Sequence, residues 1–149
     1  MTLRTAQIET AIHDIHDFFT DWVGGRCPGD AETFQRNALE RISDDLVAIF
    51  PAGRRFGKED FKGYMSSIYG SNPDFRIKIR DIRVNHVNSS MAVVNYQEWQ
   101  KAAKDSDEPN NGRITTMVLG EKSSGGIEIL QVHETWLPQE VVAAGDFHF

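Results

Sequence analysis

The chain has 149 residues, 40% of them hydrophobic, so it is long enough to bury a sizeable core and its composition is globular rather than disordered. Its formal net charge of −6 argues against a general nucleic-acid binder, because binding phosphate backbones requires a basic surface. The single cysteine, Cys27, excludes an internal disulfide.

No stretch of the sequence is long and apolar enough to span a membrane, and the start of the chain lacks the apolar run of a signal peptide. We therefore expect a cytoplasmic protein without a membrane or nucleic-acid partner. A lone thiol is compatible with a reducing compartment.

A long amphipathic helix is predicted from about Thr5 to Val23, because apolar residues recur there at three- and four-residue spacing. Its polar face carries His13 and His16, three residues apart, beside Asp17. Such a spacing suits a metal ion, but the sequence shows no further ligand at a spacing typical of metal sites. We interpret this face as solvated and predict no metal site.

Two shorter helices and one short strand follow. Asp30 is placed to cap a helix over residues 31–41, and Gly57 precedes another over residues 58–69. Between them, residues 46–50 have the composition of a short buried strand.

The rest of the chain is predicted to form strands. The apolar residues after Phe75 change phase, which predicts a bulge near Arg80-Asp81. Further strands are expected over residues 91–102, 113–121 and 126–136, with a long polar loop at 104–112.

Helices followed by strands predict an α+β fold. We expect a cone-shaped, curved antiparallel sheet wrapped around the long N-terminal helix, with two further helices. Residues 1–149 are taken as one domain, with terminal extensions at residues 1–5 and 139–149.

The closing strand carries the main functional hypothesis. Alternate side chains of a strand share a face, so Gln131, His133 and Thr135 are predicted to point the same way. His133 is able to transfer a proton near neutral pH, which makes it the candidate catalytic residue. The alternative is a partly buried histidine whose hydrogen bonds are satisfied by its neighbours.

Three segments, in their order and spacing, resemble the nuclear transport factor two-like superfamily, also called the cystatin-like or SnoaL-like fold. They are Asp44–Gly53, Gly57–Phe61 and Ile129–Trp136. The last is also similar to the closing strand of the calcium/calmodulin-dependent protein kinase II association domain, where His133 matches the first of two inward histidines. The resemblance covers about residues 6–138 and implies the fold but no single activity, because this fold hosts isomerases, dehydratases, cyclases, hydrolases and assembly modules.

The resemblance also implies a ligand pocket on the concave face of the sheet, lined by odd-numbered strand positions and closed by aromatic residues. The predicted lining is Trp22, Phe50, Tyr64, Asn95, Gln97, Trp99, Thr115, Met117, Gln131, His133 and Thr135. The first helix has no tyrosine where isomerases of this fold carry an oxyanion donor. An epoxide-hydrolase-like site would need inward aspartates and an arginine, and Arg113 lies on a suitable strand but near the loop.

Three functions stay open, and whether the protein is an enzyme is undecided. The first is binding of an unidentified small molecule, in a homodimer formed through the outer sheet face. The apolar residues predicted for that face are Val94, Tyr96, Thr116, Val118, Leu130, Val132 and Trp136. The second is a lyase or isomerase that uses His133 as general acid or base. The third is a dimeric assembly module whose cavity is filled by Trp99 and Met117. No cofactor is expected, because the sequence has no glycine-rich phosphate loop, paired cysteines or strong metal spacing.

Overall fold

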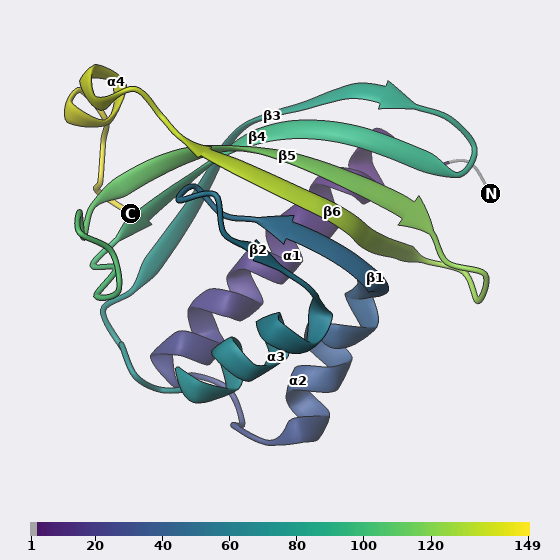
Figure 1. The fold of residues 1–149 in the computed structure, drawn as a ribbon, viewed down its shortest axis with the longest axis horizontal. Coiled ribbons are helices and arrows are strands. Elements are labelled where there is room, and N and C mark those ends of the chain that lie inside the picture. The colour runs from purple at the N-terminus through teal and green to yellow at the C-terminus, as the bar shows by residue number, and fades with distance from the viewer. Residues whose placement is uncertain (1–2) are drawn as a thin grey trace.

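A curved six-stranded sheet covers a layer of helices (Figure 1). The computed structural model describes residues 3–149, so the first two residues of the predicted N-terminal extension lie outside the described part of the chain. The elements in chain order are α1 (Thr5–Gly24), α2 (Ala31–Asn37), the short 3-10 helix η1 (Leu39–Arg41), β1 (Ile42–Ile49), β2 (Arg55–Phe56), α3 (Lys58–Ser67), β3 (Arg76–Val87), β4 (Met91–Lys101), β5 (Asn111–Glu121), β6 (Ile127–Trp136) and α4 (Gln139–Ala143). The predicted α+β fold is confirmed.

The strands lie in the order β2-β1-β6-β5-β4-β3. Neighbouring strands run antiparallel except β1 and β6, which are parallel. The predicted sheet is therefore confirmed with one parallel pairing. The sequence pattern did not indicate this pairing, because β1 comes from the helical half of the chain.

Helix α1 crosses the concave side of the sheet and supplies the centre of the core (Figure 1). Ile8, Ile12 and Ile15 on one stripe of the helix are almost fully buried. They pack in one cluster with side chains from β4 and β5, including Val94 and Leu119. Among residues 3–149, no helix is long and apolar enough to cross a membrane.

Two local predictions are confirmed. The Asp30 side chain accepts a hydrogen bond from the backbone N–H of Thr33 at 2.7 Å and so caps α2. The register of β3 against β4 shifts after Arg80, and Asp81 has a φ of 55°, so the strand bulges where the apolar residues change phase.

The face prediction for β4 is wrong. Val94 and Tyr96, expected on the outer face, are buried in the core, while Asn95 and Gln97 lie on the outer face. The row with Val94 and Tyr96 is the more apolar one, and it is buried against α1 because burial of apolar area fixes the register of a strand. The prediction had assigned the more polar row to a binding site.

The face prediction for the second half of β6 is also wrong. Ile129 pairs with Leu119 and Gln131 with Val118, so Leu130 is an extra residue in β6. Such a bulge moves every following side chain to the opposite face. Val132 and Trp136 therefore face the concave side instead of the outer face. Ile127 and Ile129, before the bulge, pack in the core as expected.

The C-terminal tail packs on its own chain. After α4, Phe147 contacts the Trp99 ring with 5.4 Å between ring centroids, and Arg80 Nη2 donates a hydrogen bond to the Asp146 carbonyl at 2.7 Å. A side chain on Gly145 would meet the Trp99 ring, so the glycine allows this close approach. The burial of Trp99 thus comes from the tail rather than from a cavity.

Candidate functional site

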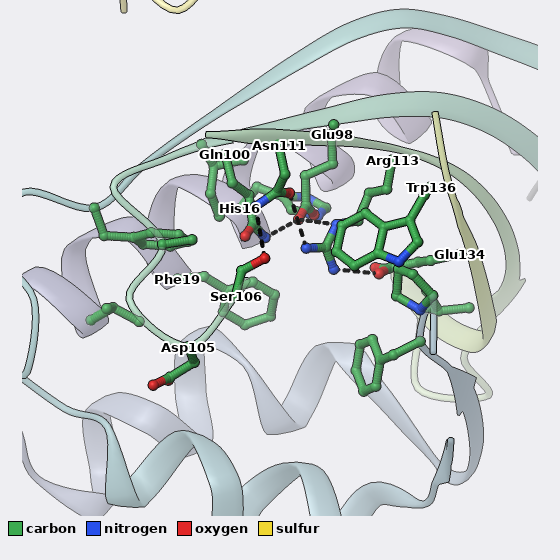
Figure 2. Close-up of a pocket in the computed structure, with 18 of the residues that line it drawn as sticks. His16, Phe19, Glu98, Gln100, Asp105, Ser106, Asn111, Arg113, Glu134 and Trp136 are labelled. Atoms are coloured by element: carbon green, nitrogen blue, oxygen red, sulfur yellow. Dashed lines mark hydrogen bonds and ion pairs between the residues drawn. The ribbon is translucent and has the colours of Figure 1, made fainter. Parts of the chain in front are cut away.

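A cavity of about 1440 Å³ lies between the concave face of the sheet and the helices. Most of its wall is apolar, with side chains from the helices α1 and α3 and from several strands of the sheet. Large apolar residues of this wall are Phe19, Phe50, Phe56, Phe61, Met65, Met117 and Trp136. Residues of the loop between β4 and β5, such as Asp105 and Ser106, line another part of the cavity (Figure 2). A largely apolar cavity with a few polar groups is the usual form of a small-molecule site.

The polar part of the wall begins at His16 on α1, which is 5% exposed. Its Nδ1 lies 2.7 Å from the Ile12 carbonyl oxygen, which only accepts, so Nδ1 carries a hydrogen. Its Nε2 lies 2.9 Å from Oε1 of Glu98 on β4. Since α1 passes under β4 at this point, a helix residue and a strand residue form a buried ion pair.

Glu98 is held from several directions. Besides His16, Gln100 Nε2 donates a hydrogen bond to Glu98 Oε2 at 2.6 Å. Arg113 Nε on the neighbouring strand β5 lies 3.8 Å from the same oxygen. Both carboxyl oxygens thus face donors, which stabilises the ionised form.

Arg113 connects Glu98 to a second carboxylate. Its Nη1 donates to Glu134 Oε2 on β6 at 2.8 Å, and the guanidinium lies 4.9 Å from the ring centroid of Trp136. Figure 2 shows Glu98, Arg113 and Glu134 following one another along the sheet, with Trp136 beside Arg113. We call His16, Glu98, Arg113 and Glu134 the charged row. Three adjacent strands and α1 contribute one residue each.

The two carboxyl groups have opposite pKa shifts. Burial alone would raise the pKa of Glu98, but the hydrogen bond and charge of His16, with the charge of Arg113, hold it at about 2. Burial and the negative charge of Glu98 raise the pKa of Glu134 to about 7, although Arg113 opposes this shift. Burial would lower the pKa of His16, but Glu98 outweighs it and raises the pKa above 6.5. Glu134, with a pKa of about 7, therefore exchanges a proton near neutral pH.

The predicted catalytic residue is elsewhere. His133 is exposed on the outer face, opposite Thr116 on β5, and Gln131 and Thr135 are exposed beside it. The orientation predicted for these three residues is wrong. The extra residue at Leu130 turns the side chains that follow it to the opposite face of the sheet.

The other predicted lining residues divide into three groups. Phe50, Tyr64 and Met117 line the cavity, and the Tyr64 hydroxyl donates to Asp105 Oδ2 at 3.3 Å. Trp22 and Thr115 are also buried. Trp22 packs in a separate cluster with Phe34 and Met65, where its Nε1 donates to the Met65 carbonyl. Asn95, Gln97 and Trp99 belong to the outward row of β4, so their predicted position is wrong. Whether any of the lining residues binds a ligand stays a prediction.

The charged row was missed, although the sequence contains a signal for part of it. His16 follows Ile12 by four residues and precedes Phe19 by three, so it belongs to the apolar stripe rather than to the polar face. Glu98 continues the row of Val94 and Tyr96 in the same way. A charged residue in phase with an apolar row is a candidate for a buried ion pair.

Metal binding has no geometric support in the part of the chain that is described. Among residues 3–149, no three histidine, cysteine, aspartate or glutamate side chains are grouped so that they could hold a metal ion. His13 is exposed, whereas His16 is committed to Glu98, so the two histidines of α1 do not point to one site.

Comparison with known proteins identifies relatives of this architecture. The family model described as the SnoaL-like domain matches residues 15–137. Among proteins with curated descriptions, none matches this sequence.

Solved structures with the same fold are numerous, and three represent them. An NTF2-like protein of unknown function from Pseudomonas aeruginosa has a TM-score of 0.77 and 22% identity, over 89% of this chain and 99% of that chain. The CamKII hub homology domain of Chlamydamonas reinhardtii has a TM-score of 0.65 and 16% identity, over 89% and 98%. A ketosteroid isomerase-like protein from Erwinia carotovora atroseptica has a TM-score of 0.60 and 14% identity, over 89% and 95%. At these identities the likeness concerns the fold alone, and it confirms the resemblance inferred from the sequence.

Proposed function

Because the chain belongs to the SnoaL-like domain family, we propose that it binds a small molecule in the cavity beneath its sheet. The observation that carries the proposal is the charged row, a buried run of paired charges along one wall of a cavity of about 1440 Å³ that is otherwise mainly apolar. The ligand is mainly apolar and carries an oxygen function that reaches Arg113 and Glu134.

The pairing within the charged row favours an uncharged ligand. His16 pairs with Glu98 at 2.9 Å and Arg113 with Glu134 at 2.8 Å, so the four charges sum to zero when His16 is protonated and Glu134 is ionised. A charged ligand would be buried without a counter-ion, which is costly. The acidic loop residues Asp105, Asp107 and Glu108 are exposed, so solvent screens their effect.

Three nine-carbon probes that differ in charge test this proposal. At pH 8, where Glu134 is mostly ionised, we expect nonan-2-one to bind at least about tenfold more tightly than nonanoate or nonylamine. Isothermal titration calorimetry measures the three dissociation constants, and quenching of Trp136 fluorescence reports on the site. Equal binding of all three, or binding of none, would contradict the proposal.

A second candidate function is proton transfer by Glu134, of the kind an isomerase or lyase needs. The observation that favours it is that Glu134 is 6% exposed, lines the cavity and has a pKa of about 7. A ketosteroid isomerase-like protein is among the structural neighbours. An epoxide-hydrolase-like reaction is less favoured, because Glu98, with a pKa of about 2, is too weak a base to activate water.

Exchange of the α-protons of nonan-2-one in D₂O tests this second candidate by NMR. The native protein is expected to accelerate exchange, and Glu134→Gln to lose about 10²-fold or more of that acceleration, the usual range for a general acid or base. Glu59→Gln, an exposed substitution on α3 with the same change in charge, should behave like the native protein. Unchanged exchange in Glu134→Gln would exclude Glu134 as the proton carrier.

We also retain the homodimer through the outer sheet face, with a corrected set of residues. Met91 and Ile114 are each 42% exposed on that face. Met91 lies near the half-buried pair Val93 and Val118, and Ile114 lies further along β5, opposite Gln97. Large apolar side chains exposed on a sheet face are typical of an interaction surface. A pure assembly module with a filled cavity is less favoured, because Trp99 packs against the tail instead of filling it. One domain over residues 1–149, a cytoplasmic location and the lack of a nucleic-acid or membrane partner stay predictions.

A further inference from the structure

We propose that His16 is a positioning residue that decides which of the two carboxyl groups flanking Arg113 holds the exchangeable proton. In this assignment His16 keeps Glu98 ionised, and the proton resides on Glu134. The inference rests on the proposed function of the cavity but concerns the protein without ligand.

The hydrogen-bond geometry of His16 carries the first step. Nδ1 must carry a hydrogen because it faces the Ile12 carbonyl at 2.7 Å. The 2.9 Å contact between Nε2 and Glu98 Oε1 then requires one further proton between them. That proton gives either an imidazolium with a carboxylate or an imidazole with a carboxylic acid.

The surroundings of Glu98 decide between these two states. Its other oxygen accepts from Gln100 at 2.6 Å and faces Arg113 Nε at 3.8 Å. Both states keep the contact with His16 and the hydrogen bond from Gln100, but a carboxylate oxygen accepts that bond more strongly, and only a carboxylate is stabilised by the positive charge of Arg113. The pair is therefore an imidazolium with an ionised Glu98.

Glu134 has fewer stabilising contacts. Arg113 Nη1 donates to it at 2.8 Å, and the cavity wall formed by β1 and the residue after it is apolar, with Ala48 and Phe50. The charged groups that face it are Arg113 from β5, Glu98 from β4 and, one step further, His16 from α1. Two carboxylates on one guanidinium repel each other, so the less stabilised one, Glu134, takes the proton.

Without the imidazolium, Glu98 and Glu134 would have similar affinities for the proton. Glu98 would keep Gln100 and Arg113 but lose its closest positive charge. The pair would bind its first proton at a higher pH, and both carboxyl groups would share it across Arg113. The second proton would also bind at a higher pH than in the native protein.

Carbon NMR of the glutamate carboxyl groups tests the inference, with Glu98→Gln and Glu134→Gln to assign the signals. In the native protein, the Glu134 signal is expected to titrate near pH 7 while Glu98 stays ionised down to about pH 2. In His16→Gln, which retains a hydrogen-bond donor, the Glu98 signal should titrate more than about one pH unit higher. His13→Gln, an exposed substitution on the same helix, should leave both titrations unchanged.

A structural role alone predicts a different outcome. If His16→Gln folds and Glu98 still titrates as in the native protein, the inference is wrong. If the variant does not fold, nitrogen NMR of the native His16 ring decides, because a neutral ring at pH 6.5 would overturn the assignment and a fully protonated ring would support it. These titrations need no ligand, so they can support the inference even when the three nine-carbon probes fail to bind. Equally, the probes can bind as proposed when the titrations contradict the inference.

Discussion

Glu134 links the protonation of the charged row to the stability of the fold. Its pKa rises from an ordinary 4.5 to about 7 because it is buried and lies near Glu98. A carboxyl group with a raised pKa contributes stability in its protonated form. That contribution is complete below pH 4.5 and is lost as the pH rises through 7. At about 1.4 kcal/mol per pKa unit, the loss is roughly 3 kcal/mol.

The variant Glu134→Gln removes this dependence, since glutamine resembles the protonated side chain at every pH. Its free energy of unfolding should equal that of the native protein near pH 4 and exceed it by up to roughly 3 kcal/mol at pH 8. Urea denaturation at five values between pH 4 and pH 8 measures the difference, while Glu59→Gln should follow the native protein throughout. His16, whose pKa is also raised, contributes to the pH dependence of both proteins and largely cancels. A difference that does not change with pH would count against a raised pKa of Glu134.

At the scale of elements, local sequence patterns predict the helices correctly but not the face to which each strand turns its side chains. The helices and their caps follow from local patterns, so the start of α1 and the cap at Asp30 were predicted within a few residues. The bulge in β3 was visible as well, because apolar residues stand on both sides of the slip. Local chemistry was sufficient for these features.

The bulge in β6 left no such signal. On either side of Leu130 the residues suit a strand in both phases, and the extra residue shows only in the pairing with β5. One inserted residue was enough to send His133 outward and bring Glu134 beneath the sheet. The predicted site failed here because pairing between strands is a tertiary property, which no single strand encodes.

The charged row is likewise assembled from distant parts of the chain. His16 and Glu134 are separated by most of the sequence and meet through Glu98 and Arg113. Individual residues gave hints, such as His16 within the apolar stripe of α1. Their combination follows from the strand order β6-β5-β4 over that helix.

At the scale of the whole molecule, the cavity and the proposed dimer use opposite faces of one sheet. The concave face holds the charged row, and the outer face presents Met91 and Ile114. A dimer through the outer face would leave the cavity open to ligand. Assembly and binding can therefore be changed separately.

Sedimentation velocity at micromolar concentration tests the dimer. The native protein is expected to sediment as a dimer and Ile114→Asp as a folded monomer, because the substitution would bury an unpaired carboxylate at the interface. Val141→Asp, at a comparably exposed apolar position on α4, should stay dimeric. A native protein that is strictly monomeric would contradict the proposed dimer.

The central claim is that the paired charges above the cavity decide which molecule it accepts, and the affinity of Glu134→Gln for nonanoate tests it most directly. At pH 8 the substitution leaves Arg113 without its partner on β6, so the charged row gains one positive charge. We expect nonanoate to bind this variant at least about tenfold more tightly than it binds the native protein, while nonan-2-one gains nothing. If the two proteins bind nonanoate equally, the charged row does not select the ligand and the account is wrong.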